Sequence, residues 1–339
     1  MSTQPTSVLT FNDLILEVAR KIGVASYGAA GTSVAAIPTD AHDLAECKRH
    51  VNNAIRMFVA DAPKTGWRWT RPTASIDCWA SVGIVAGVTI TAGAYDSAND
   101  ETPITANTSA FYESMEEKTI VATVGGSIVV KRYVSATQVM VYGNHATIAA
   151  STYTITADGN YTLPRTFAGA YTGGITFASA TNRAVQVNWS NETVIRQMRE
   201  NVTVDTGIPR YAAVSTFPAQ VGRRRWQLML YPTPYQLFTL QFPFDLHFDS
   251  LVSATDNPPS PIAHDEAIRA ACLAVVERDV DDTNGPAMAY YAKCLEQSRL
   301  IDDRSGPRKL GYFGNDAAVV TPRNFREFMK RPNVTYNTP

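Results

Sequence analysis

The 339-residue sequence predicts an α+β protein in which a helical core is interrupted by a β-rich insertion. Two observations lead to this class. Residues 74–190 carry only 13 of the 61 charged side chains and are rich in Thr, Val, Ile, Tyr, Ala and Gly. Segments with the apolar spacing of amphipathic helices lie on both sides of that stretch, so we expect the insertion to split one helical core.

Composition narrows the possible partners and compartments. The chain has 30 Lys and Arg residues and 31 Asp and Glu residues, which gives a net charge of -1. This balance excludes a protein that binds nucleic acid over its whole surface through an excess of basic residues. The four cysteines are far apart and form no CxxC pair. The N-terminus lacks the basic and apolar regions of a secretory signal, and residues 82–92 are too short to span a bilayer. We expect a cytoplasmic product with no membrane association.

Residues 1–73 predict two helices at the start of the helical core. Thr10 and Asp13 form a capping box, and Gly23 ends the apolar stripe that follows, made of Leu14, Ile15, Val18 and Ile22. Asp40 or Asp43 caps the second helix, which ends before Pro63 and has its apolar residues at Leu44, Cys47, Val51, Ile55 and Phe58.

Residues 74–190 predict the inserted β domain. Short β-branched runs at 119–124, 127–134, 138–142 and 151–156 are separated by Gly- and Asn-containing turns. This spacing is typical of a small β-sandwich or barrel.

Residues 191–259 predict a short helix at 191–200 and strands at 210–216, 225–231 and 236–242. Three consecutive cations precede the second of these strands: Arg223, Arg224 and Arg225. They are interpreted either as a solvated hairpin turn, which is favoured, or as a contact with a partner's carboxylates or with DNA phosphates.

Residues 260–303 predict a closing helix pair. Ser260 and Pro261 start the first helix, residues 284–286 break it, and its apolar stripe is Ile268, Cys272, Val275 and Val276. The second helix carries Tyr290 or Tyr291, Cys294, Ser298 and Ile301. A second, partly apolar face at Ala270, Ala271 and Ala274, beside Val275 and Val276, could supply one side of a contact between subunits. The turn contains Asp279, Asp281 and Asp282, which fail the calcium-loop pattern and are expected either to form a simple turn or a negative surface.

Residues 304–339 differ from the rest of the chain. They carry a charge of +5, which leaves -6 for the remainder. Four prolines and the absence of a helical period predict a basic, extended C-terminal arm, either a solvated tail or, as we favour, a segment that orders on a partner. Its candidate partner-binding residues are Arg304, Arg308, Lys309, Tyr312, Phe313, Arg323, Phe325, Arg326, Phe328, Lys330 and Arg331.

Catalytic patterns are weak throughout the chain. The five histidines lack ligand spacing, and the sequence contains no phosphate-binding, dinucleotide-binding or nucleophile-elbow motif. We therefore nominate no catalytic residue, metal ligand or cofactor. A hydrolase that uses Asp245 or Asp249 ranks last among the functions considered.

Several motifs, taken in order, resemble the head-to-tail adaptor (connector) family of tailed phages. They are the helices ending in Trp67-Arg-Trp69, Asp158-Gly-Asn-Tyr-Thr-Leu-Pro164, Pro209-Arg-Tyr-Ala, the segment from Gly222 to Pro234, Phe242-Pro-Phe, Asp256-Asn-Pro-Pro and Pro261-Ile-Ala-His264. The likeness covers most of residues 10–303. The Ala/Thr-rich insertion departs from the smallest family members, which lack it.

The resemblance implies a structural virion protein without a catalytic site. Such proteins form rings, dodecameric in related cases, that dock under the portal protein, extend the channel for double-stranded DNA and provide the tail or neck attachment surface. It implies location in the virion neck after assembly in the host cytoplasm. The competing interpretation is a tail-associated or surface module that binds glycan, with Tyr112, Trp79 and Trp189 as stacking residues, although core packing is favoured for them.

Overall fold

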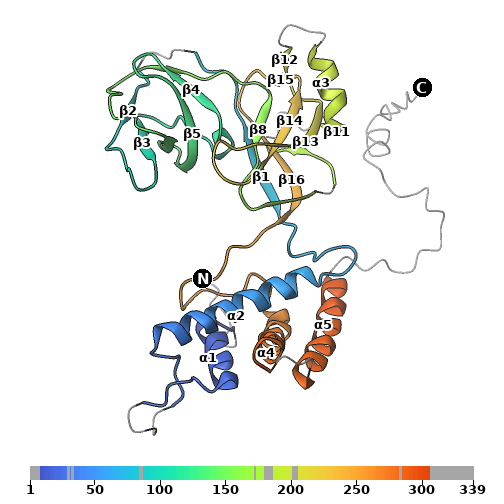
Figure 1. Ribbon diagram of the computed structural model, residues 1–339. Coiled ribbons are helices and arrows are strands. Elements are labelled where there is room, and N and C mark those ends of the chain that lie inside the picture. The colour runs from blue at the N-terminus through green and yellow to red at the C-terminus, as the bar shows by residue number, and fades with distance from the viewer. Residues whose placement is uncertain are drawn as a thin grey trace, which may run out of the picture.

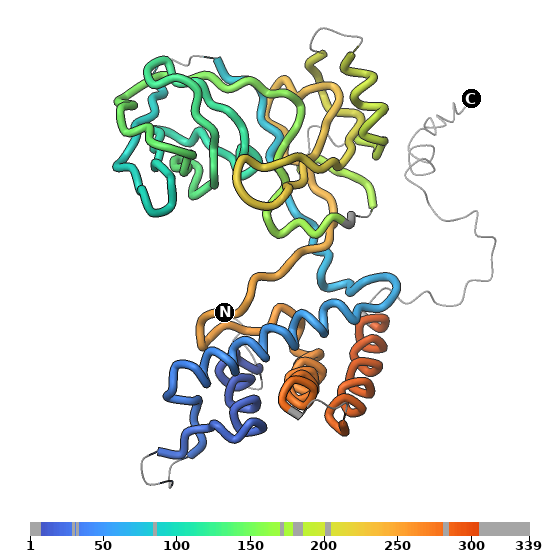
Figure 2. The backbone as a smooth tube through the Cα atoms, in the orientation of Figure 1, coloured from blue at the N-terminus to red at the C-terminus, as the bar shows by residue number. Residues whose placement is uncertain are grey.

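The computed structural model describes residues 8–28, 31, 34–83, 87–171, 173–178, 186–200, 205–281 and 285–305. The α+β class is confirmed within these residues. A body of helices and a β-rich body are joined by two neighbouring segments of chain, as Figure 1 shows. The tube in Figure 2 follows the same two crossings between the bodies.

The helical body contains α1 (Phe11–Ile22), α2 (Ala41–Ala60), α4 (Asp265–Asp281) and α5 (Pro286–Ser305). The predicted caps are confirmed. Thr10 and Asp13 form a reciprocal capping box on α1, Gly23 ends that helix at a φ of 89°, and the Asp40 side chain accepts from two amides at the start of α2. Helices from both ends of the chain share one hydrophobic core.

Helix α4 lies at the centre of this body and is packed by α1, α2 and α5. The predicted subunit-facing alanines are therefore wrong: Ala270, Ala271 and Ala274 are at most 1% exposed and belong to the internal core. With three neighbouring helices, α4 is surrounded by protein, and its small side chains permit close helix approach. No apolar face of α4 remains for a second subunit at these positions.

The start of α4 is built differently from the prediction, whereas the predicted break before the second helix agrees with the start of α5 at Pro286. Ser260 does not cap the helix: its buried hydroxyl has no partner among the described residues, and a short 3-10 turn, η3 (Ile262–His264), precedes α4. At the other end the Glu277 carboxylate accepts from the Ala287 and Met288 amides and so caps α5. Gly285 is required there, because a Cβ would lie 2.5 Å from a Glu277 oxygen.

A curled antiparallel sheet forms one half of the β body. Backbone hydrogen bonds between Ile90 and Ser151 (2.8 and 2.9 Å) join its two ends. In spatial order its strands are β2 (Ile90–Ala92), β3 (Glu101–Ala106), β6 (Gln138–Tyr142), β5 (Gly126–Ser135), β4 (Thr119–Ala122) and β7 (Tyr153–Thr154). A 3-10 turn, η1 (Glu113–Met115), leads into β4.

The other half of the β body contains three smaller sheets. One sheet is built around β16 (Phe238–Leu246), which pairs with β1 (Thr73–Cys78), β10 (Thr176–Phe177) and β9 (Phe167–Tyr171). A second has the order β11 (Asn188–Trp189), β13 (Tyr211–Phe217), β14 (Arg225–Tyr231) and β8 (Asn160–Thr162). The third pairs β12 (Thr206–Gly207) with β15 (Thr233–Pro234), and α3 (Glu192–Glu200) packs on β13 and β14.

The expected boundary at residue 190 does not separate two cores. Strands that precede it, including β1 and β8, pair with β16 and β14, which follow it. One hydrophobic core spans both sets of strands. The strand predicted at 236–242 continues to Leu246, because Phe242 and Phe244 alternate with half-buried positions and stay buried on either side of Pro243.

The two crossings between the bodies contact each other. The Leu246 amide donates to the Thr70 carbonyl (3.0 Å), and Arg71 Nε lies 2.6 Å from Asp245 Oδ1. The rings of Trp69 and Phe248 are 5.5 Å apart. The chain therefore leaves the helical body and returns to it at one place.

Overpacking α4 should destabilise the protein. We expect Ala270→Leu to lower the free energy of unfolding by about 1–3 kcal/mol, because the added atoms have no space between the helices. Urea denaturation followed by circular dichroism measures the change. Leu300→Ala on the exposed side of α5 is the matched control and should stay within about 0.5 kcal/mol of wild type. Equal effects of the two substitutions would contradict the central position of α4.

Buried His264 should make stability depend on pH. Its ring packs beside Phe58 and Trp67, and Nδ1 lies 3.1 Å from the Ser298 hydroxyl. Burial lowers the pKa of His264, partly offset by the nearby Asp302 carboxylate. The unfolded chain then binds a proton that the folded protein excludes, so stability is complete above the unfolded pKa and is lost as pH falls below about 6.5.

We expect His264→Gln to reduce the loss of unfolding free energy between about pH 7.5 and about pH 5.5. Denaturation curves at the two pH values measure it. His247→Gln, a change at an exposed histidine, should leave the pH dependence of wild type. An unaltered pH dependence in His264→Gln would show that other groups are responsible.

Candidate functional site

A basic cleft lies on the β body where the loop between β13 and β14 approaches β5 and β16. Its cavity has a volume of about 550 Å³. Five cationic residues line it, together with Glu117, His247 and the aromatic residues Tyr142, Phe167 and Trp226. The five cations are Lys131, Arg165, Arg223, Arg224 and Arg225.

Three of these cations are neutralised by buried carboxylates. Glu116 accepts from Arg225 Nη1 at 2.8 Å and from Arg165 Nε at 3.1 Å. Its other oxygen accepts from the Tyr133 amide at 2.9 Å. Glu101 likewise pairs with Lys131 at 3.2 Å. Arg225 is therefore a structural residue rather than a free contact, because burial makes its carboxylate partner dependent on it.

Glu117 holds the base of the loop without a cation. One of its carboxylate oxygens accepts from the Tyr142 hydroxyl at 2.6 Å, and the other accepts from the Gln220 amide at 2.9 Å. Burial and the Glu117 hydrogen bond raise the pKa of Tyr142 to about 12, so its hydroxyl remains a donor at neutral pH. These bonds tie the loop to the curled sheet.

Arg223 and Arg224 remain at the tip of the loop. Both are exposed, and neither makes a side-chain hydrogen bond or ion pair within the described part of the chain. A guanidinium presents several donors in one plane and binds a carboxylate or phosphate through two parallel hydrogen bonds. The predicted set of three arginines thus divides into one structural residue and two that can reach a partner.

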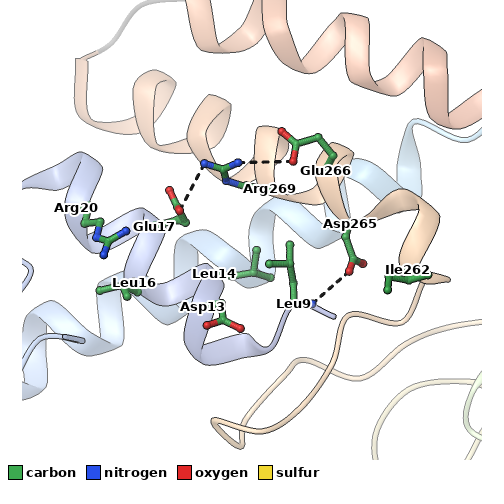
Figure 3. Close-up of a pocket in the computed structure, with 10 residues that line it drawn as sticks. All are labelled: Leu9, Asp13, Leu14, Leu16, Glu17, Arg20, Ile262, Asp265, Glu266 and Arg269. Atoms are coloured by element: carbon green, nitrogen blue, oxygen red, sulfur yellow. Dashed lines mark hydrogen bonds and ion pairs between the residues drawn. The ribbon is translucent and has the colours of Figure 1, made fainter. Parts of the chain in front are cut away.

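A second charged surface, the α1/α4 groove, lies on the helical body. It has a volume of about 580 Å³, and Figure 3 shows the side chains that line it from α1, α4 and η3. Arg269 bridges Glu17 and Glu266 across it at 3.5 and 3.6 Å. Asp265 accepts from the Leu9 amide at 3.3 Å. The sequence analysis missed this surface, because its residues come from opposite ends of the chain.

In the predicted negative surface after α4, one carboxylate is already engaged within the subunit. Asp279 contacts His50 Nδ1 at 3.3 Å and Arg278 at 3.1 Å, so its carboxylate is engaged within the subunit. Asp281 is the last residue of α4, and Asp282 lies outside the described residues. Of the C-terminal arm, Arg304 is an exposed residue near the end of α5, and the candidates from Arg308 to Arg331 lie outside the described residues.

The three aromatic residues considered for glycan stacking contribute to packing. Trp79 is 1% exposed and contacts Tyr161 edge-on with ring centres 5.6 Å apart. Trp189 packs against Phe242 and donates from Nε1 to the Gly173 carbonyl at 2.8 Å. Tyr112 is partly buried against the same core. The expectation of core packing is confirmed for these residues, and they form no open stacking platform.

Removing Arg225 should destabilise the fold, whereas removing Arg224 should not. Arg225→Ala leaves the buried Glu116 carboxylate with one of its two cations, at a cost of about 3 kcal/mol. Arg224→Ala should change the unfolding free energy by less than about 0.5 kcal/mol. Chemical denaturation of both variants measures the difference, and similar stabilities would contradict the division of the arginine set.

The described residues contain no group of three His, Cys, Asp or Glu side chains arranged to hold a metal ion. Asp245 is paired with Arg71 and bonded to Thr70 instead of forming an acid/base set with His247. No described helix combines the length and apolar character needed to cross a membrane. No family model matches the chain, and no curated protein matches it.

Proposed function

We propose that this chain is a structural virion protein, a head-to-tail adaptor whose copies form a ring under the portal of a tailed phage. The ring would extend the channel for double-stranded DNA and provide the surface to which tail or neck proteins attach. The proposal places the protein in the virion neck and gives it no catalytic role.

One observation carries the proposal. Two of the segments that resemble adaptor proteins, beginning at Pro209 and at Gly222, form the antiparallel pair β13–β14. The loop between them is anchored through Glu117 and presents Arg223 and Arg224 to solvent. A rigid hairpin with a cationic tip supports docking on an acidic protein surface or on phosphate groups.

Ring formation also fits the placement of charge. A closed ring requires heterologous contacts, in which one side of a subunit meets a different side of the next. The basic cleft and the α1/α4 groove are two unlike surfaces on the two bodies. The charge of -6 before residue 304 is compatible with a channel that does not retain DNA, because each neutralised phosphate adds affinity.

Electron microscopy of the purified protein and of mature particles tests the proposal. Rings with a central hole, together with density for the protein in the neck, would support it. A protein that stays monomeric at high concentration and is missing from the neck would overturn it. Monomers that bind a glycan array would favour the surface-module alternative instead.

The C-terminal arm should be required for assembly but not for folding. Every residue of the described hydrophobic cores precedes residue 304, so a chain truncated there should keep the thermal unfolding transition of the full protein. We expect the truncated chain to lose docking to portal-bearing capsids in a sedimentation assay. Normal docking by a folded, truncated chain would remove the arm from the assembly mechanism.

A further inference from the structure

The α1/α4 groove is lined by both apolar and acidic side chains. Leu9, Leu16 and Ile262 provide apolar surface, and Ile262 is 43% exposed. The charged lining residues are four carboxylates and two arginines, namely Asp13, Glu17, Asp265, Glu266, Arg20 and Arg269. Such a lining fits a segment that carries both cations and large apolar side chains.

Asp265 gives the groove an incompletely compensated charge. The residue is 8% exposed, and its carboxylate accepts one hydrogen bond, from the Leu9 amide at 3.3 Å. In the described part of the chain, no cation lies within ion-pair distance of it. Burial accordingly raises the pKa of Asp265. A buried carboxylate of this kind gains most from a cation supplied by a partner.

The chain itself contains a segment of the complementary composition. Residues 323–331 lie in the C-terminal arm and read Arg-Asn-Phe-Arg-Glu-Phe-Met-Lys-Arg, with four cations and two phenylalanines against one glutamate. Phenylalanine rings can pack on the leucine and isoleucine side chains of the groove, and the cations can pair with its carboxylates. Residues 64–72 and 223–231 have the same net charge of +3 with two aromatic side chains, but both stretches are part of the folded bodies.

The positions of the helices favour a neighbouring copy as the source of this segment. Helices α1 and α5 flank α4 on opposite sides (Figure 1). The arm follows α5, whose end is fixed by Asp302 accepting from the Arg68 amide at 3.2 Å. The stretch of chain between Ser305 and Arg323 can span about 60 Å when extended. A closed ring brings two different sides of the subunit together, and the α5 and α1 sides of this body are one such unlike pair.

We infer that the α1/α4 groove of one copy binds residues 323–331 of the arm of the adjacent copy. This contact rests on the proposed ring and identifies its partner as a second copy of the chain. Arg323 or Arg326 reaches the Asp265 carboxylate, while Phe325 and Phe328 cover Leu16 and Ile262. The arm thus links successive subunits beyond the contacts of their folded bodies.

Photo-crosslinking in the full-length protein tests the contact. A benzophenone amino acid replaces Leu16 in the groove, and assemblies are made from equal parts of isotopically heavy and light chains. Mass spectrometry should find crosslinks to residues 323–331 that join heavy to light chains. The same group at Val124, which is exposed after β4 on the β body, is the control and should not yield that peptide.

Substitutions on both sides supply a second measurement. Asp265→Asn removes a charge that burial disfavours, so the variant should fold with unchanged or higher stability, yet its crosslink yield should fall at least tenfold. Arg323→Glu with Arg326→Glu should produce the same loss. Arg308→Glu with Lys309→Glu makes the same charge change elsewhere in the arm and should retain most of the yield.

The outcomes separate this inference from the proposed function. Rings that form without crosslinks to 323–331, or with crosslinks only inside one chain, overturn the inference and leave the adaptor ring intact. Crosslinks between chains without rings support the groove contact and overturn the ring. Equal yields from the two arm variants would also overturn the inference, because they would reduce the contact to nonspecific charge attraction.

Discussion

The packing of α4 by helices from both ends of the chain is the constraint on which the rest of the structure depends. Nearly every side chain in the middle of α4 is buried, so α1 and α2 must meet α4 and α5 although about 200 residues separate them. That meeting requires the intervening chain to leave and return at one place. The contacts between Thr70 and Leu246 and between Arg71 and Asp245 are the result.

The charges of the β body follow a second rule. Buried carboxylates form ion pairs with the cations that stabilise the fold, as Glu116 does with Arg165 and Arg225. Among the cations that line the basic cleft, Arg223 and Arg224 have no such partner within the described residues and remain for contact with another molecule. The three consecutive arginines at 223–225 therefore have two different roles. The side chain that enters the strand supports the fold, and the side chains that stay in the loop reach outward.

Much of the fold followed from local patterns in the sequence. Thr10, Asp40 and Gly23 mark helix ends because capping depends on nearby backbone groups. Patterns that depend on distant packing were harder to interpret. Ala270, Ala271 and Ala274 resemble a free face until three helices are known to surround them, and Pro243 resembles the end of a strand until Phe244 is seen to continue the buried alternation.

The candidate site shows the same division. Arg223 and Arg224 were identified because loop cations stand out in a sequence with few charges. The α1/α4 groove could not be identified, since Leu9 and Asp265 are brought together only by the tertiary fold. Buried carboxylates such as Glu116 carry no local signal either, because their burial is set by the strands that cover them.

The paired crossings have a consequence for how such a chain can vary. With respect to the four core helices, residues 71–245 form one very long insertion. The hydrogen bond from the Leu246 amide to the Thr70 carbonyl joins its two ends. The closure entropy of a loop rises only slowly with its length. Enlarging, trimming or exchanging that loop during evolution would therefore leave the helical scaffold in place, and chains of very different length can retain the same four helices.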